Sequence, residues 1–332
     1  MRIVFFGTPD YVIPILERLN KNFRDKNEKQ PIAAVVTQKP KPVGRKQLLE
    51  YSPVDKWAHK KNVPIFFDSI ELIKQNVQAD IGILAAYGEI IPEKVIKSFL
   101  HGIINIHFSL LPELRGASPV ESAIVSGRKE IGVTIFKIDD KLDHGPIVSQ
   151  FKEEIREEDT TETLRKRLFE KSAEVLTTLL PAYISGKITL REQDHKKASY
   201  TREIKKNDAF IPPVVLQSVL DGKKSAKDWV ISFIKNYSLV PSAYSLERFI
   251  RAMQPWPVSW TYVQLGERLK VKGKRLKRLK ILKAHVEISP PTTHDSQNTK
   301  HKLVLDEVQL EGKNPVTWRQ FNQGYPNFSF DN

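Results

Sequence analysis

Cysteine is absent from this chain of 332 residues. The absence excludes a disulfide framework, a catalytic thiolate and a thiolate metal site, and it fits a reducing compartment such as the cytoplasm. Long apolar runs are missing too. The run at Ile3–Phe6 is too short for a signal peptide, and no later run is long enough to span a bilayer. We therefore expect a cytoplasmic protein with no membrane partner.

The composition is that of an ordinary globular protein, with 40% hydrophobic and 28% charged residues, and the length allows two domains. The formal charge of +14 is unevenly distributed. Residues 1–200 carry 31 Lys and Arg against 27 Asp and Glu, a net of +4, whereas residues 201–332 carry 22 against 12, a net of +10. This excess predicts a polyanionic partner for the last part of the chain, although a solubility or lineage bias towards lysine gives the same numbers.

Apolar segments with strand and helix periodicity alternate along the first 200 residues. Strands are predicted at 2–6, 32–36, 64–67, 81–86, 103–107 and 132–138, and helices at 12–19, 52–59, 69–77, 119–125 and 159–184. The strand at 81–86 is apolar throughout, so we place it centrally. The alternation predicts a doubly wound, mostly parallel α/β sheet. Gly-x-Gly-x-x-Gly is absent, so a dinucleotide fingerprint is not supported.

Two polar side chains interrupt the strand that begins the stretch 102–119. Asn105 and His107 lie two residues apart among isoleucines, so both side chains leave the same face of the strand. Ligands of open α/β sheets bind at the carboxyl ends of strands. A turn-capping asparagine and a buried structural histidine are nevertheless the ordinary explanation. A third polar group is needed to favour catalysis.

Asp143 is the candidate for that third group. It follows a predicted strand and precedes Gly145-Pro146, which forces a bend. It is either a simple turn former or a carboxylate that orients His107 and favours its charged form.

Basic residues are concentrated in two segments. Residues 37–46 hold four basic residues, two prolines and one glycine. This composition predicts an exposed loop, either a solvated linker or an arm that binds phosphate. Residues 268–283 hold nine basic residues in sixteen and no acid, and their alternation predicts a hairpin around Gly273 with one basic and one apolar face.

Solvated lysines on an edge strand are the usual explanation for such a pattern. We favour binding to an RNA backbone, because a small β-barrel with a basic face is a common platform for polynucleotides. The candidate RNA contacts in the two segments are Lys41, Arg45, Lys46, Lys272, Lys274 and Arg275.

Several motifs occur together along nearly the whole chain. They are Gly7-Thr8-Pro9-Asp10, Val35-Val36-Thr37-Gln38, Asn105-Ile106-His107, Ser109-Leu110-Leu111-Pro112, Arg115-Gly116, Gly132-Val133-Thr134, Asp143-His144-Gly145, Tyr200-Thr201-Arg202, Pro255-Trp256-Pro257 and Gln320-Phe321-Asn322-Gln323-Gly324-Tyr325. Together they resemble the methionyl-tRNA formyltransferases, within the wider family that uses 10-formyltetrahydrofolate. The C-terminal motifs are the ones that favour the tRNA enzymes over their relatives.

The resemblance implies a Rossmann-like formyltransferase domain at 1–204, a linker with an extra insert at 205–246, and an OB-like β-barrel that binds tRNA at 247–332. It implies transfer of the formyl group of 10-formyltetrahydrofolate to the α-amine of methionine on initiator Met-tRNA, for translation initiation and without a metal. We expect a monomer.

The chemistry assigns roles to the candidate residues. The amine attacks the formyl carbon, and Asn105 and His107 are suitable donors to the oxygen that becomes negative. Asp143 is suited to relay the amine proton. The resemblance implies tetrahydrofolate contacts at Ser109, Leu110, Leu111 and Pro112. We further expect the 87–92 loop to read the pterin edge, with Tyr87, Gly88, Ile90 and Ile91 as candidates.

The chain departs from the family pattern in three places. Gln47 and Leu48 stand where further lysines are usual, His144 stands where the tRNA enzymes usually have threonine, and residues 207–245 form a longer connection, in which 228–234 is predicted to be helical. Two alternatives stay open: a folate-dependent formyltransferase for a small amine, such as an amino sugar nucleotide or a purine precursor, and a non-catalytic RNA-binding relative.

Overall fold

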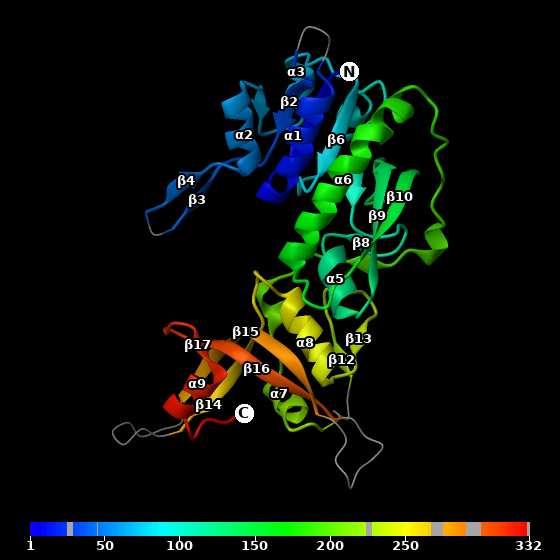
Figure 1. The fold of residues 1–332 in the computed structure, drawn as a ribbon. Coiled ribbons are helices and arrows are strands. Elements are labelled where there is room, and N and C mark those ends of the chain that lie inside the picture. The colour runs from blue at the N-terminus through cyan, green and yellow to red at the C-terminus, as the bar shows by residue number, and fades with distance from the viewer. Residues whose placement is uncertain (25–28, 45, 224–227, 267–274, 290–299, 331–332) are drawn as a thin grey trace. The chain divides into compact units, whose positions relative to one another are not determined.

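The computed structural model describes residues 1–24, 29–44, 46–223, 228–266, 275–289 and 300–330 (Figure 1). The chain divides into two compact units. The first comprises residues 1–116, 130–154 and 165–199, and the second comprises residues 117–129, 155–164 and 200–332. Within the described segments, no helix combines the length and the apolar character needed to cross a membrane.

A seven-stranded sheet forms the centre of the first unit, in the order β10-β9-β7-β6-β1-β2-β5. Neighbouring strands from β7 to β5 are parallel, whereas β9 and β10 are antiparallel to their neighbours. The bounds are β1 Ile3–Gly7, β2 Ile32–Val36, β5 Ile65–Phe66, β6 Ile81–Ala85, β7 Ile103–His107, β9 Glu130–Lys137 and β10 Ile147–Glu154. The predicted doubly wound, mostly parallel sheet is confirmed, with β6 at its centre.

Helices cover both faces of this sheet. Their bounds are η1 Asp10–Val12, α1 Ile13–Asn22, α2 Pro53–Lys61, α3 Glu71–Lys74, α4 Glu93–Ile96 and α6 Thr161–Ile184. On one face, Phe6 of β1 belongs to a buried cluster with Leu72 of α3 and Val95 of α4. On the other, α1 lies beside α6, and Phe169 of α6 packs against Phe108, just after β7, with ring centroids 4.5 Å apart (Figure 1). The strand that carries Asn105 and His107 is therefore buried on both sides.

The basic segment near residue 40 is a hairpin rather than the predicted irregular loop. Strands β3 (Lys41–Val43) and β4 (Leu48–Glu50) pair antiparallel, and all six residues are exposed. Pro42 is compatible with this ladder because each strand has only one partner in it. The exposure was predicted correctly, but the pairing was missed.

A four-stranded antiparallel sheet organises the second unit, in the order β14-β15-β16-β17. Its strands are β14 Trp260–Leu265, β15 Arg275–Ser289, β16 Lys300–Leu310 and β17 Val316–Thr317, and the associated helices are α5 Pro119–Val125, α7 Pro213–Leu220, α8 Ala243–Ala252 and α9 Trp318–Gly324. The predicted basic hairpin is found in part: residues 276–281 lie in β15, and 276–280 pair with residues 260–264 of β14, while 267–274 lie outside the described residues. Buried Leu279 and Ile281 flank the more exposed Lys280, as the alternation predicts.

The insert packs onto the edge of this sheet. It begins with η3 (Lys206–Ala209), and the Ile211 N–H then donates to the Trp260 carbonyl oxygen of β14 at 2.8 Å. The helix predicted at 228–234 is wrong. Strand β12 (Trp229–Val230) pairs there with β13 (Ser238–Leu239), because Trp229 packs on Phe249 of α8 with ring centroids 4.5 Å apart, and tertiary contacts override local propensity.

Candidate active site

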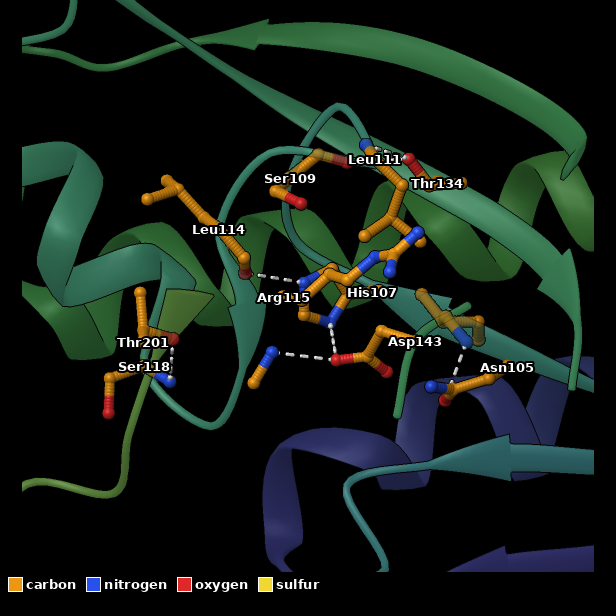
Figure 2. Close-up of polar contacts among 12 residues, drawn as sticks. Asn105, His107, Ser109, Leu111, Leu114, Arg115, Ser118, Thr134, Asp143 and Thr201 are labelled. Carbon is orange, nitrogen blue, oxygen red and sulfur yellow. Dashed lines mark hydrogen bonds and ion pairs between the residues drawn. The ribbon is translucent and has the colours of Figure 1, made fainter. Parts of the chain in front are cut away.

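The segment after β7 folds back onto the sheet. The Ser109 hydroxyl donates to the Glu113 carbonyl oxygen at 2.5 Å, and Thr134 of β9 donates to the Ser109 carbonyl oxygen at 2.6 Å. Thr134 also accepts the Leu111 N–H at 3.1 Å (Figure 2). A Cβ atom on Gly132 would lie 2.3 Å from Leu110 Cγ, so only glycine lets this segment approach β9 so closely. The predicted folate contacts at 109–112 therefore have a fixed backbone.

His107 is held at the carboxyl end of β7. Its Nε2–H donates to the Leu114 carbonyl oxygen at 2.9 Å, and its side chain is 7% exposed. Leu114 has a left-handed backbone, with φ of +53°, and its N–H donates to the Ser199 hydroxyl at 2.8 Å. A carbonyl oxygen only accepts, so Nε2 carries a proton. The other ring nitrogen, Nδ1, is therefore the one that faces the remaining polar groups of the site.

Asp143 is the group that Nδ1 faces. Its Oδ2 lies 3.6 Å from His107 Nδ1 and accepts the Gly116 N–H at 2.7 Å (Figure 2). The carboxylate therefore lies beside the ring nitrogen that is not bonded to Leu114. The distance exceeds that of a hydrogen bond, so the Nδ1–H is able to donate to another acceptor.

The turn that carries Asp143 has to fold back to reach this position. Because β9 is antiparallel to β7, Lys137 at the end of β9 lies opposite Ile104, roughly 10 Å before His107 along the strand. A Cβ atom on Gly145 would lie 1.9 Å from the Lys137 carbonyl oxygen, so the turn closes directly against β9. Asp143 itself has φ of +47°, which is left-handed.

Asn105 presents a free donor. Its Oδ1 accepts the Ile106 N–H at 2.8 Å, which fixes the orientation of the amide group. Among the described residues, no acceptor is bonded to its Nδ2, and the residue is half-buried. The structure thus brings His107 and Asp143 into contact, with the Asn105 amide on the same strand.

The 87–91 candidates divide between the core and the surface. Tyr87 is buried, its ring centroid is 5.9 Å from that of Phe6, and its hydroxyl donates to Glu89 at 3.2 Å. Burial and Glu89 both raise the pKa of Tyr87 above its usual range. Its carbonyl oxygen accepts Gln38 Nε2 at 3.2 Å. Gly88 has φ of +81°, Ile91 is buried and Ile90 is exposed, so Ile90 is the apolar side chain of this loop that is free for a ligand.

The basic candidates are described only in part. Lys41 lies on β3, where its Nζ donates to Gln38 Oε1 at 3.1 Å, and Lys46 is exposed. Arg275 is the first residue of β15, whereas Arg45, Lys272 and Lys274 lie outside the described residues. In the described segments, no three His, Asp or Glu side chains are grouped so as to hold a metal ion.

Two buried residues beside the site were missed. Arg115 of β8 (Arg115–Gly116) is 3% exposed and donates to Gln193 Oε1 at 2.6 Å. Gln193 is 5% exposed. The Arg-Gly motif was noted in the sequence, but nothing local connects it to a glutamine 78 positions later.

Comparisons with known proteins agree with this architecture. A family model described as formyl transferase matches residues 1–180, and a model of the formyl transferase C-terminal domain matches residues 240–326. A methionyl-tRNA formyltransferase of Listeria welshimeri is 36% identical over 271 residues, which cover 79% of this chain and 76% of that protein. The methionyl-tRNA formyltransferase of Bacillus subtilis is 30% identical over 343 aligned positions, which cover 97% of this chain and 94% of that protein.

Solved structures resemble the fold at low sequence identity. An N-formyltransferase of Helicobacter canadensis, in complex with folinic acid and dTDP-3-aminofucose, has a TM-score of 0.60 at 16% identity, covering 92% of this chain and 98% of that one. Methionyl-tRNA formyltransferase from Clostridium thermocellum has a TM-score of 0.50 at 14% identity, with the same coverage. At such identities the likeness concerns the fold alone.

Proposed function

This chain belongs to the formyl transferase family, and we propose that it transfers the formyl group of 10-formyltetrahydrofolate to the α-amine of methionine on initiator Met-tRNA. The choice of Met-tRNA as the acceptor rests on one observation. Nearly the whole chain, including its C-terminal part, matches a methionyl-tRNA formyltransferase at 30% identity. The net charge of +10 over residues 201–332 suits the many phosphates of a tRNA better than the single diphosphate of an amino sugar nucleotide.

Asn105 and His107 stabilise the negative charge that develops in the reaction. The amine nitrogen attacks the formyl carbon, and the formyl oxygen becomes an oxyanion in the tetrahedral intermediate. The unbonded Asn105 Nδ2–H and the His107 Nδ1–H are the two donors. Removing one donor of this kind costs about 3 kcal/mol of barrier.

Asp143 moves the proton. The attacking amine loses a proton and N10 of the folate gains one as the bond from N10 to the formyl carbon breaks, so a single carboxylate suffices as a relay. Asp143 Oδ2 is bonded to the Gly116 N–H, and the other oxygen, Oδ1, is the relay atom. Its Oδ2 also lies 3.6 Å from His107 Nδ1, beside the nitrogen that donates to the oxyanion.

The residues around the site fit a folate co-substrate. Leu110 and Pro112 follow His107 directly on a segment fixed by Thr134, and Ile90 is an exposed apolar side chain. A flat pterin needs such apolar walls together with main-chain donors and acceptors. All candidate catalytic and folate-binding residues come from one chain, so a monomer is sufficient, and we place the reaction in the cytoplasm.

Transfer of a labelled formyl group tests this function. Purified protein is incubated with labelled 10-formyltetrahydrofolate and, in parallel, with initiator Met-tRNA, elongator Met-tRNA and an amino sugar nucleotide. We expect label on initiator Met-tRNA and much less on the other two acceptors. Label on the sugar alone would favour the small-amine alternative, and no label on any acceptor would favour a non-catalytic RNA-binding protein.

A further inference from the structure

We propose that Gln193 is a positioning residue that holds the Asp143 turn in place, so that the Asp143 carboxylate faces His107. The proposal rests on the proposed function for its catalytic meaning, but the contacts stand without it. Gln193 lies after α6, 50 positions beyond Asp143, and has no place in the chemical steps themselves.

The side chain of Gln193 bonds to both ends of the turn. Its Nε2 donates to the Asp143 carbonyl oxygen at 3.0 Å and to the Gly145 carbonyl oxygen at 2.7 Å. Its Oε1 accepts Arg115 Nη2 at 2.6 Å. With both amide protons used and the oxygen bonded to a buried guanidinium, the orientation of the glutamine amide is unambiguous. One side chain therefore fixes the carbonyl groups on either side of His144.

The Asp143 backbone needs such support. A non-glycine residue with positive φ, such as Asp143, is strained and persists only where its surroundings determine its conformation. The direction of the Asp143 side chain follows from this backbone, because Cβ is fixed by N, Cα and C. A change of φ at Asp143 would turn Cβ, and with it the carboxylate, away from the Gly116 N–H and the imidazole.

A second residue close to Gln193, His195, contacts the side chain of His144 in the same turn. The His195 ring stacks on the His144 ring, with centroids 3.9 Å apart and planes 6° from parallel. Arg115 Nη2 donates to His195 Nδ1 at 2.8 Å, and His144 Nδ1 bonds to Asp139 Oδ2 at 2.7 Å. Arg115 thus joins Gln193 and His195, which together contact residues 143, 144 and 145.

The amide proton of Gly116 reports the carboxylate position directly, since its acceptor is Asp143 Oδ2. Hydrogen exchange at Gly116 is compared in the wild type, in Gln193→Met, which keeps the volume but loses the donors, and in Asp143→Ala. Tyr183→Phe is the matched control, because it also removes a bond to a backbone carbonyl oxygen, that of His101 at 2.8 Å, in the same unit. We expect faster exchange in Gln193→Met and Asp143→Ala, and wild-type exchange in Tyr183→Phe.

Steady-state kinetics then separate positioning from simple loss of stability. We expect Gln193→Met to lower kcat by about 10- to 100-fold, with KM for tRNA unchanged within about twofold, because small misplacements of a reacting group are costly. In an Asp143→Asn background the same change should cost less than about threefold, since residues that act through one another are not additive. Tyr183→Phe should keep the wild-type kcat.

Two outcomes would overturn the proposal. One is wild-type protection of the Gly116 amide in Gln193→Met. The other is a multiplicative loss in the double variant, which would make Gln193 independent of Asp143. A wild-type protein that fails to formylate Met-tRNA would instead contradict the proposed function, while the exchange measurement would still decide whether Gln193 positions the carboxylate.

Discussion

Three non-glycine residues with left-handed backbones occupy the turns around the candidate site. They are Ala86, Leu114 and Asp143, with φ of +48°, +53° and +47°. Each such residue stores on the order of 1 kcal/mol of strain. Leu114 uses this conformation to aim its carbonyl oxygen at His107 Nε2, and Asp143 uses it to aim its carboxylate at Nδ1. Each ring nitrogen of His107 is thus contacted by a residue in a strained turn.

Replacing Asn105 and His107 tests their proposed role as oxyanion donors. We expect Asn105→Ala and His107→Ala each to lower kcat by about 10²- to 10³-fold, with tRNA affinity retained, because each removes a donor used mainly in the transition state. Formylation kinetics and a tRNA binding assay measure the two effects. His59→Ala, an exposed histidine of α2, is the control and should leave both unchanged. Equal losses in kcat and in tRNA affinity would contradict the assignment.

His195 predicts a loss of stability at acid pH. Desolvation lowers the pKa of His195, and His144, Arg115 and Lys141 lower it further, while Glu192 opposes them. A histidine whose pKa is lower in the folded state binds its proton more readily when unfolded, so stability falls as the pH drops through about 6.5 and below. We expect Tm to fall less between pH 7.5 and 5.5 in His195→Phe, which keeps a ring for stacking but has no titrating group. An identical fall in both proteins would contradict this.

Local spacing explains which residues were found from the sequence. Asn105 and His107 share a strand face, and Asp143 is marked by the Gly145-Pro146 bend, so short-range rules suffice to single them out. Gln193 and Arg115 were missed because their contacts join residues 50 to 80 positions apart. Arg115 was noted only as part of the Arg115-Gly116 motif, and nothing in its neighbourhood in the sequence indicates that its side chain is buried.

At the scale of elements, Gly132 allows the segment 109–112, the proposed folate contact, to lie close to β9. Gly132→Ala would place Cβ 2.5 Å from the Leu110 backbone nitrogen, which cannot move as a flexible side chain does. We expect a loss of about 1–3 kcal/mol in unfolding free energy and weaker folate binding, measured by denaturation and by fluorescence titration. Gly324→Ala, with open space around its Cβ, should change neither. Unchanged folate affinity in Gly132→Ala would count against the assignment of this segment.

The start of the insert depends on an ion pair. Burial raises the pKa of Asp208, but bonds from Arg202, from the Lys205 N–H and from Ser232 outweigh burial and hold it at about 2. Because this pKa is below that of the unfolded chain, the stabilisation is complete above pH 4 and is lost between pH 4 and 2.

We therefore expect Asp208→Asn to lower unfolding free energy by about 1–2 kcal/mol at pH 7, allowing for the partly exposed Arg202, and by much less at pH 2.5. Urea denaturation at the two pH values measures this. Glu174→Gln, which removes an exposed pair with Arg18 at 3.5 Å, is the control and should cost less than about 0.5 kcal/mol. A cost for Asp208→Asn that does not vary with pH would contradict the ion-pair account.

Periodicity predicted the elements of the first unit well and those of the insert poorly. Six strands of the central sheet lie within one or two residues of their predicted bounds, because their apolar residues indicate strands without further information. No bounds were predicted for β10, whose sequence mixes polar and apolar residues. The conformation of the segment 228–234, in contrast, is not determined by its own sequence. Its conformation depends on Phe249 and on pairing with Ser238–Leu239, which local sequence does not indicate.

For the whole molecule, the uneven charge predicts how tRNA affinity responds to salt. Lys280 and Lys283 lie on β15, in the segment with the densest basic charge. Replacing both with glutamine should reduce the slope of log affinity against log salt by about 1.4 to 1.8 if both contact phosphates. Lys60→Gln with Lys61→Gln, on α2, makes the same change of net charge and should leave the slope unchanged. Equal reductions would mean that net charge, not a particular surface, governs binding.

The family and the two-part architecture were predictable because motifs recur along the whole chain, each of them short and local. The division of the chain was harder to foresee, since residues 117–129 and 155–164 belong to the second unit although the first unit surrounds them in sequence. A method that divides the chain at a single linker cannot predict that these two segments belong to the second unit.

The position of Gln193 has a consequence for synthesis on the ribosome. By the time residue 184 has been polymerised, every strand of the central sheet and all three proposed catalytic side chains already exist. The glutamine that would secure the Asp143 turn has not yet been added. On the proposed role of Gln193, a nascent chain completes the strands of its central sheet before it gains the residue that secures the Asp143 turn.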